Sequence, residues 1–173
     1  MKKITFVIGG CRSGKSRHAI ELAEKVPGTQ KAFVATCIPR DEEMNQRVAR
    51  HRQERSSSWI TLEVPVRLAD TIRQKSTQYD LMLIDCLTLW MSNLLLETED
   101  FETIDRHVTD LTLALENVQC PIILVSNEVG TGIVPENRLA RLFRDATGFS
   151  NQKVAACADE VVWMVAGISV KIK

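Results

Sequence analysis

Short apolar runs alternate with stretches of helical character along most of this 173-residue chain. The runs are rich in Val, Ile, Leu and Phe, which is typical of strands buried on both faces of a parallel sheet. The first run begins at Ile4, and the later ones cover residues 31–36, 60–63, 80–85, 121–126 and 160–165. Residues 167–173 are expected to pair with the last run as a hairpin.

Between these runs, the spacing of apolar residues or the overall composition favours helices. The predicted helices cover residues 17–25, 41–56, 66–74, 87–97, 104–118 and 136–158, the last as one helix or as two separated near Gly148. Residues 100–105 are acidic and are expected to form an exposed loop that connects two helices. This alternation predicts one α/β domain over residues 1–173, with helices on both faces of a mostly parallel sheet and a C-terminal hairpin.

The first apolar run leads directly into Gly9-x-x-x-x-Gly14-Lys15-Ser16, the spacing of a phosphate-binding P-loop. The two glycines let the backbone curl so that several N–H groups point toward phosphate oxygens. Lys15 supplies a positive charge for the β- and γ-phosphates, and the Ser16 hydroxyl is a ligand for Mg²⁺. The alternative is a glycine-rich turn that only connects a strand to a helix and binds no ligand. The strand before the motif and the helix after it favour nucleotide binding.

Composition and charge narrow the class of protein further. Twenty-two basic residues balance 22 acidic ones, which argues against a general affinity for nucleic acid or anionic membranes. The first strand starts at once and no apolar run could span a bilayer, so we expect neither a signal peptide nor a membrane span and a cytoplasmic location. The five cysteines are scattered and form no C-x-x-C pair, which indicates free thiols.

Ligands of parallel sheets bind at the carboxyl ends of the strands, so polar residues that end the predicted strands are candidates for the site. Asp85 ends the run 80–85, and in P-loop proteins an acid at such a position holds Mg²⁺. Asn127 and Glu128 follow the run 121–126. For these two residues a catalytic role and an ordinary loop role are equally compatible with the sequence.

The predicted helix over residues 41–56 has few large apolar residues, so we expect it to be exposed or to lie over a site. Arg47, His51 and Arg55 share one helical stripe, flanked by Arg50 and Arg52. Nearby guanidinium groups would keep the imidazole neutral, which suits attack on a nucleotide phosphate. A solvated basic helix face explains the same pattern. His18 and His107, the other histidines, are expected to be a packing residue and a solvated residue.

Taken together, these motifs resemble the family of bifunctional adenosylcobinamide kinase / adenosylcobinamide-phosphate guanylyltransferases, over nearly the whole chain. The resemblance begins with residues 9–17 and continues through residues 41–44, residues 47–52 and Arg55, Trp59 to Glu63, residues 85–90 and 93–95. Its most distinctive part is the run 125–137, Val-Ser-Asn-Glu-Val-Gly-Thr-Gly-Ile-Val-Pro-Glu-Asn. Further matches are residues 144–145, 151–152, 158–160 and 167–173.

This resemblance implies a RecA-like P-loop fold and two reactions. In the first, ATP or GTP phosphorylates the aminopropanol hydroxyl of the corrinoid adenosylcobinamide. In the second, GTP guanylylates a histidine, which matches His51 here, and the GMP then passes to adenosylcobinamide phosphate to give adenosylcobinamide-GDP. The resemblance also implies homotrimers with sites between neighbouring subunits, and no short motif locates the corrinoid.

Carried over residue by residue, the resemblance assigns catalytic roles to His51 and Lys15 and Mg²⁺ binding to Ser16 and Asp85. The positions that match nucleotide-binding residues are Gly9, Gly10, Cys11, Arg12, Ser13, Gly14, Lys15, Ser16, Val34, Ala35, Thr36, Arg52, Gln53, Glu54, Arg55, Glu63 and Asp85. Two positions depart from the family pattern. Cys11 stands where alanine is frequent, and Arg50 stands where some members carry a second histidine, which leaves His51 as the candidate nucleophile.

Two other functions are compatible with the P-loop. A small-molecule kinase without guanylyl transfer would form no covalent nucleotide adduct and would not need His51. A nucleotide-dependent regulatory protein would bind GTP without turning over any corrinoid. The covalent adduct therefore distinguishes the bifunctional enzyme from both alternatives.

Overall fold

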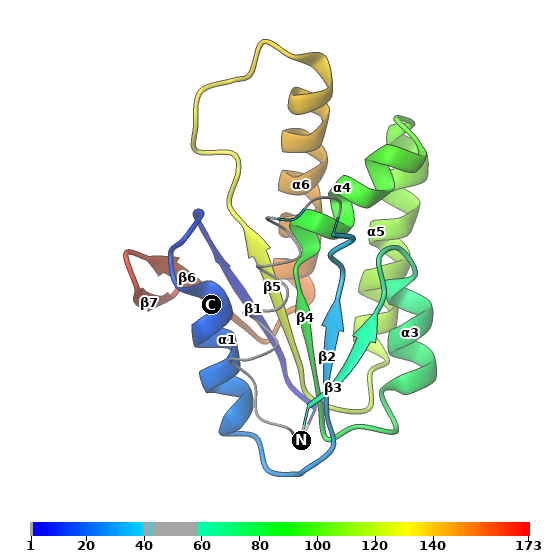
Figure 1. Cartoon of the computed structure of the whole chain (residues 1–173), viewed down its shortest axis with the longest axis vertical. Helices are drawn as coiled ribbons and strands as arrows, with labels where there is room; N and C mark the ends of the chain where they lie inside the picture. The colour runs from blue at the N-terminus through cyan, green and yellow to red at the C-terminus, as the bar shows by residue number, and fades with distance from the viewer. Residues whose placement is uncertain (1, 40–41, 43–58) are drawn as a thin grey trace.

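A computed structural model describes residues 2–39, 42 and 59–173 of the chain. In this part the backbone forms a seven-stranded sheet in the order β3-β2-β4-β5-β1-β6-β7 (Figure 1). Its strands are β1 (Ile4–Gly9), β2 (Lys31–Ala35), β3 (Trp59–Glu63), β4 (Leu81–Asp85), β5 (Ile122–Asn127), β6 (Glu160–Val165) and β7 (Ile168–Lys171). Neighbouring strands are parallel except for β6 and β7, which form the expected antiparallel hairpin.

Helices cover both faces of this sheet, as the alternating pattern predicts (Figure 1). They are α1 (Lys15–Glu24), α3 (Leu68–Lys75), α4 (Leu87–Glu97), α5 (Phe101–Glu116) and α6 (Arg138–Cys157). Successive residues of β1 contribute to opposite faces, because Phe6 and Ile8 belong to the core under α3–α6 whereas Val7 packs in the core under α1. The continuous apolar runs are therefore strands buried from both sides.

One prediction about the helices needs correction, and the structure decides one alternative that the sequence left open. Residues 100–105 do not form a connecting loop, because the Asp100 carboxylate accepts a hydrogen bond from the Thr103 N–H at 3.0 Å and caps α5, which starts at Phe101. Gly148 does not divide the last helix, since α6 runs unbroken from Arg138 to Cys157. A glycine costs a helix only about 1 kcal/mol, which the buried face of α6 readily outweighs.

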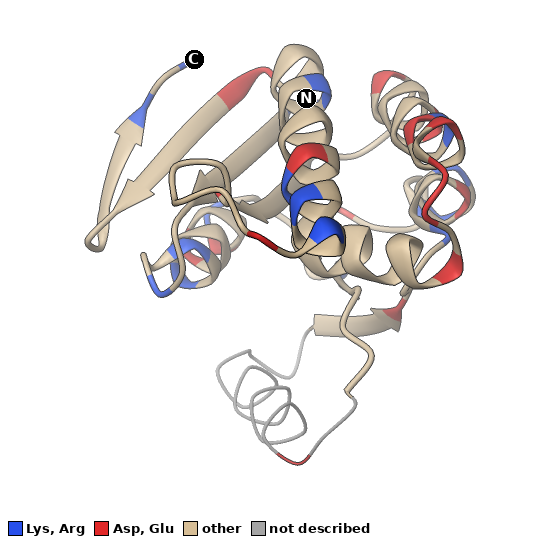
Figure 2. Cartoon of the chain, turned by 90° about the horizontal axis from the view of Figure 1, so that it is seen from above, with Lys and Arg blue, Asp and Glu red and all other residues tan. Residues whose placement is uncertain are grey.

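The helix predicted over residues 41–56 lies, apart from Glu42, outside the described residues. The same holds for His51, Arg52, Gln53, Glu54 and Arg55. Along the helices that are described, basic and acidic positions are intermixed (Figure 2). Within the described chain, no helix has both the length and the apolar character needed to cross a bilayer.

The carboxyl end of β2 is fastened to α4 by one buried side chain. Asn93 is 8% exposed, and its amide donates to the carbonyl oxygens of Thr36 at 2.8 Å and Pro65 at 2.9 Å. Thr36 follows β2 and Pro65 follows β3, so these hydrogen bonds hold the carboxyl ends of both strands against α4.

We predict that Asn93→Leu lowers the free energy of unfolding by about 2–4 kcal/mol, because the buried Thr36 carbonyl and the half-buried Pro65 carbonyl lose their donor. Urea denaturation followed by circular dichroism measures the change. Ser92→Ala, one residue away and half-buried, is the matched control and should shift stability by less than about 0.5 kcal/mol. Equal stability of the two variants would contradict a structural role for the Asn93 amide.

Candidate active site

The predicted P-loop connects β1 to α1 and has the backbone shape of an anion-binding loop. Arg12 and Gly14 both adopt positive φ angles, 54° and 93°, and the Ser13 N–H donates to the Gly10 carbonyl at 3.3 Å. Gly14 occupies the N-cap position of α1 and supplies no capping side chain. The first N–H groups of α1 and the positive end of its dipole are therefore directed to the loop, where they favour a phosphate.

Lys15 lies inside this loop and is 7% exposed. Its ammonium group donates to the Gly10 carbonyl at 2.5 Å and lies 3.5 Å from the Ser13 hydroxyl. Burial lowers the pKa of Lys15, while the nearby Asp85 opposes that shift. A phosphate bound in the loop would favour the charged form of the lysine, so part of the burial cost would be regained when an anion binds.

The C-terminal hairpin supports the loop from the side, which sequence reasoning did not anticipate. A Cβ atom on Gly9 would lie 2.3 Å from the Met164 carbonyl oxygen of β6, so only glycine fits there. The Gly167 N–H, at the hairpin turn, donates to the Ser13 carbonyl at 3.1 Å. The Cα of Gly167 is also 3.5 Å from the position of a Cβ on Gly14. The hairpin thus holds the loop in its anion-binding shape.

The strand ends predicted to form the site lie in one row along the carboxyl edge of the sheet. Ala35 is in register with Glu63 on one side and Asp85 on the other. Gly9 is in register with Asn127, and β5 separates β4 from β1. The row therefore runs from Glu63 through Asp85 to the P-loop, and the influence of Asp85 on Lys15 agrees with this placement.

Ser16 and Asp85 suit the magnesium ion for which the sequence proposes them. A hydroxyl and a carboxylate are hard oxygen donors, and Mg²⁺ commonly takes one or two protein ligands and completes its shell with phosphate oxygens and water. The described residues include no cluster of three or more His, Cys, Asp or Glu side chains that could hold a metal by itself. The donor set thus fits a metal that arrives with the nucleotide.

The stretch Val34, Ala35 and Thr36 has little side-chain surface to offer a ligand. Val34 is 1% exposed and Thr36 is fully buried. The Thr36 hydroxyl donates to the Cys86 carbonyl at 2.8 Å and accepts from the Cys86 N–H at 2.9 Å. Thr36 thereby fixes the corner that follows Asp85, and any nucleotide contact of this stretch is expected through its backbone or through Ala35.

The structure gives Asn127 and Glu128 defined places beside the P-loop. The Asn127 N–H donates to the Thr88 hydroxyl at 2.7 Å, and the Glu128 N–H donates to the Gly9 carbonyl at 3.0 Å. The Glu128 carboxylate accepts from the Gly130 N–H at 2.5 Å, so it organises the following loop. This contact is a loop role for Glu128, one of the two roles that the sequence allows for it, and both roles remain alternatives for Asn127.

All five cysteines are free thiols, as the sequence predicts. Burial raises the pKa of Cys86 to about 12 and that of Cys120 to about 11, so both stay neutral near pH 7. Cys11, within the P-loop, is exposed. Of the histidines, His18 faces the Glu21 carboxylate at 3.9 Å and His107 is exposed, in line with their expected minor roles.

Comparison with known proteins connects this site to a family. A family model described as cobinamide kinase / cobinamide phosphate guanyltransferase matches residues 5–172. The bifunctional adenosylcobalamin biosynthesis protein CobU of Salmonella typhimurium is 42% identical over 180 residues, which cover 97% of this chain and 98% of that protein. CobP of Pseudomonas aeruginosa, of the same description, is 41% identical over 168 residues, which cover 97% of this chain and 96% of that protein.

Solved structures of low sequence identity share the fold. The KaiC-like protein PH0186 of Pyrococcus horikoshii has a TM-score of 0.50 at 14% identity, covering 93% of this chain and 70% of that one. A second solved structure, an ATPase domain, has a TM-score of 0.52 at 11% identity, covering 94% of this chain and 69% of that one. Together with the parallel sheet and the P-loop, these similarities confirm the predicted P-loop NTPase fold.

We predict that Gly9→Ala destabilises the protein by about 1–3 kcal/mol, because the new methyl group must displace the backbone of β6. Gly10→Ala is the matched control, since a Cβ at Gly10 meets no atom within 4 Å. Urea unfolding midpoints of the two variants provide the comparison. If Gly9→Ala unfolds at the same urea concentration as Gly10→Ala, the close packing of loop and hairpin is refuted.

Proposed function

This chain belongs to the cobinamide kinase / cobinamide phosphate guanyltransferase family, and from that premise we infer that it catalyses both reactions. The observation that carries this inference is the family match across residues 5–172, together with a P-loop of anion-binding geometry at its expected place. The names of the relatives CobU and CobP, both described as bifunctional, support the same conclusion.

In the kinase reaction, the aminopropanol hydroxyl of adenosylcobinamide attacks the γ-phosphorus of ATP or GTP. A new P–O bond forms, the bond to the β-phosphate oxygen breaks, the hydroxyl proton is lost, and the nucleoside diphosphate leaves. Backbone N–H groups of the P-loop and the Lys15 ammonium stabilise the charge that develops on the phosphate oxygens. Mg²⁺, held by Ser16 and Asp85, would neutralise charge on the β- and γ-phosphates.

In the guanylyl reaction, His51 attacks the α-phosphorus of GTP and releases pyrophosphate. The phosphate of adenosylcobinamide phosphate then attacks the same phosphorus, which breaks the P–N bond and returns the histidine. The role of His51 rests on the family resemblance, since this residue lies outside the described part of the chain. The neighbouring Arg52, Gln53, Glu54 and Arg55 are proposed to contact the bound nucleotide.

The guanine nucleotide is proposed to lie toward the β2 and β3 end of the row. Ala35 and Glu63 match nucleotide-binding positions: Ala35 ends β2 beside Asp85, and Glu63 ends β3 one strand farther along. This placement would put the base on one side of the metal site and the P-loop on the other. It is supported by the register of the strands and by the family resemblance.

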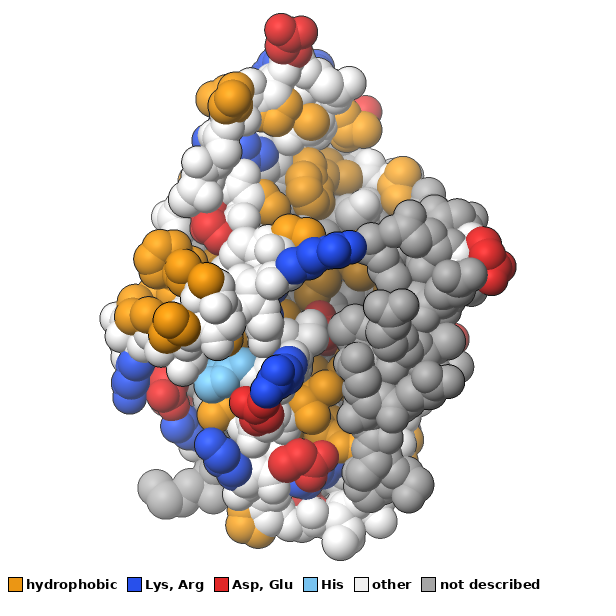
Figure 3. All heavy atoms as spheres, turned by 60° about the vertical axis from the view of Figure 1, so that its left-hand side comes forward, with side chains coloured by type: hydrophobic (Ala, Val, Ile, Leu, Met, Phe, Trp, Pro, Cys, Tyr) orange, Lys and Arg blue, Asp and Glu red, His pale blue; other side chains and the backbone are white. Residues whose placement is uncertain are grey.

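A homotrimer is proposed as the assembled state, also on the basis of the resemblance. The outer face of the β6–β7 hairpin supports assembly because large apolar side chains are exposed together on it (Figure 3). These are Trp163 at 41%, Val165 at 43%, Ile168 at 67%, Val170 at 44% and Ile172 at 60%. Contiguous apolar surface of this kind is typical of protein contacts. The cytoplasmic location remains a prediction.

Incubation with GTP and Mg²⁺ should add one GMP to the wild-type protein and none to His51→Ala, as measured by intact-protein mass spectrometry. The adduct should be lost in acid and survive in base, because a phosphoramidate bond is acid-labile. His18→Ala and His107→Ala are matched controls and should still form it. His51→Ala should still phosphorylate cobinamide. An adduct on His51→Ala, or no adduct on a wild-type protein that binds GTP, would contradict the proposed nucleophile and favour a simple kinase.

Lys15→Met should lower kcat for cobinamide phosphorylation by about 10²-fold or more, because a major source of charge stabilisation is removed. Phosphoryl transfer from labelled ATP or GTP measures the rate. Burial lowers the pKa of Lys15, so the folded state favours its charge less than the unfolded chain does, and the variant should fold normally. Lys25→Met, at the exposed end of α1, is the control. An unchanged rate in Lys15→Met would contradict the assignment.

A further inference from the structure

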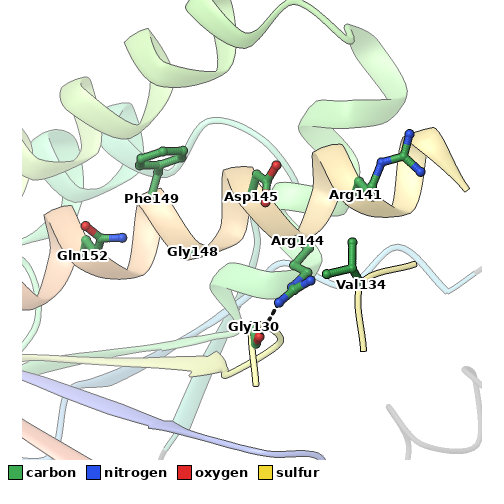
Figure 4. Close-up of a pocket in the computed structure, with 8 residues that line it drawn as sticks. All are labelled: Gly130, Val134, Arg141, Arg144, Asp145, Gly148, Phe149 and Gln152. Carbon is green, nitrogen blue, oxygen red and sulfur yellow. Dashed lines mark hydrogen bonds between the residues drawn. The ribbon is translucent and has the colours of Figure 1, made fainter. Parts of the chain in front are cut away.

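A cavity of about 370 Å³ lies between α6 and the loop that follows β5 (Figure 4). Arg141, Arg144, Asp145, Gly148, Phe149 and Gln152 line it from the helix. Gly130 and Val134 line it from the loop. We call this cavity the α6 pocket. Its volume is in the range of about 300–1,000 Å³ that is usual for sites of small ligands.

The α6 pocket lies on the same edge of the sheet as the P-loop. Its loop begins at the end of β5, where Asn127 is in register with Gly9 and the Glu128 N–H donates to the Gly9 carbonyl. Gly130, two residues later, already belongs to the pocket wall. A ligand in the α6 pocket would therefore lie beside the triphosphate site and on the opposite side of Asp85 from Glu63 and Ala35.

Hydrogen bonds fix the two walls of the pocket relative to each other. Arg144 reaches across from α6 and donates to the Gly130 carbonyl at 2.6 Å (Figure 4). Arg141 donates to the carbonyl oxygens of Pro135 at 3.1 Å and Glu136 at 2.5 Å. The loop is thus attached to the helix at both ends of the pocket, so the cavity is formed before any ligand arrives.

Gly148 is the strongest sign that the pocket is used. It lies in the middle of the unbroken helix α6, where glycine is less favourable than alanine. Its backbone is not in the left-handed region, and a Cβ atom would meet nothing within 4 Å. Neither packing nor backbone conformation therefore requires glycine at this position. A ligand that lies against the helix surface accounts for the glycine, because a residue without a side chain leaves that surface bare.

The groups around Gly148 present both hydrogen-bonding and apolar surface. Asp145 and Gln152 are exposed, and the side chain of neither makes a hydrogen bond or an ion pair with the described residues. Phe149 is 50% and Val134 60% exposed, although both are large and apolar. Such a lining suits a ligand with a flat apolar body and many amide groups at its rim, since carboxylate, carboxamide and guanidinium side chains all pair with amides.

We propose that the α6 pocket binds the rim of the corrinoid acceptor, through its peripheral amides and the adjoining edge of the macrocycle. This proposal rests on the proposed function, which supplies an acceptor of that chemistry. The whole macrocycle is too large for the cavity, so the pocket takes one edge and directs the aminopropanol arm toward the P-loop. The role also accounts for Gly130 and Val134 of the run 125–137 and for Arg144, Asp145 and Gln152, which line the pocket, lie in the stretches that carry the family resemblance and match no nucleotide-binding position.

Gly148→Met tests the proposal by filling the pocket without removing any contact of the fold. The variant should raise both the KM and the Kd for cobinamide by about ten-fold or more, because a steric misfit in a binding pocket usually has an effect of this size. Gly148→Ala should have a smaller effect of the same sign and should unfold at the same or a higher temperature than the wild type. Arg138→Met, on the same helix outside the pocket and paired with Glu99, is the control and should change neither constant.

The formation of the GMP adduct from GTP alone separates this proposal from the proposed function, because that half-reaction needs no corrinoid. Normal adduct formation with weakened cobinamide binding in Gly148→Met supports the α6 pocket as the acceptor site. Unchanged cobinamide binding in this variant overturns the proposal. Slower adduct formation or a raised KM for GTP also overturns it, because either result would assign the pocket to the nucleotide.

If the wild type forms no adduct and phosphorylates no cobinamide, the proposed function is wrong. The affinity for cobinamide, measured by equilibrium ultrafiltration, then still tests the α6 pocket. Absence of binding to the wild type would overturn the acceptor site as well. If Gly148→Met does not fold, the double variant Asp145→Ala/Gln152→Ala takes its place, with the same expected loss of cobinamide affinity and the same outcome against it.

Discussion

The close approach of the P-loop backbone to strand β6 is the contact on which the site depends. At Gly9 there is no room for a side chain, because the Met164 carbonyl of β6 occupies the space where a Cβ would lie. The hairpin turn adds a hydrogen bond from Gly167 to the Ser13 carbonyl. The C-terminal hairpin thereby supports a loop that has positive φ angles at Arg12 and Gly14 and directs N–H groups inward.

Burial of Lys15 has an electrostatic consequence that is suited to catalysis. A charge that water does not screen interacts strongly with any phosphate placed beside it. The lowered pKa shows that the fold itself opposes this charge, and the Gly10 carbonyl and the nearby Asp85 keep it in place. The site is therefore organised before the nucleotide binds, which is the condition under which fixed charges stabilise a transition state most effectively.

The arrangement of the sheet would separate the two substrates of the proposed reactions. Strand ends of β2 and β3 lie on one side of Asp85, and β5 with its loop and α6 lies on the other. The P-loop on β1 is adjacent to the β5 side. A nucleotide and a corrinoid approaching from these two directions would meet at the phosphates, where both phosphoryl and guanylyl transfer take place. The bare helix surface at Gly148 belongs to the corrinoid side of this arrangement.

The sequence by itself determined the P-loop, the alternation of strands and helices, and the acids at the strand ends. These features depend on glycine conformations and apolar spacing within a few residues. It misjudged the start of α5 and left open whether Gly148 divides α6, because capping by Asp100 and packing of the helix face outweigh local composition. Only the tertiary structure decided the strand order, the support of Gly9 by β6, the bridge from Thr36 to Cys86 and the α6 pocket. Each of these joins residues far apart in the chain, and their contacts follow from how helices and strands pack rather than from any local pattern.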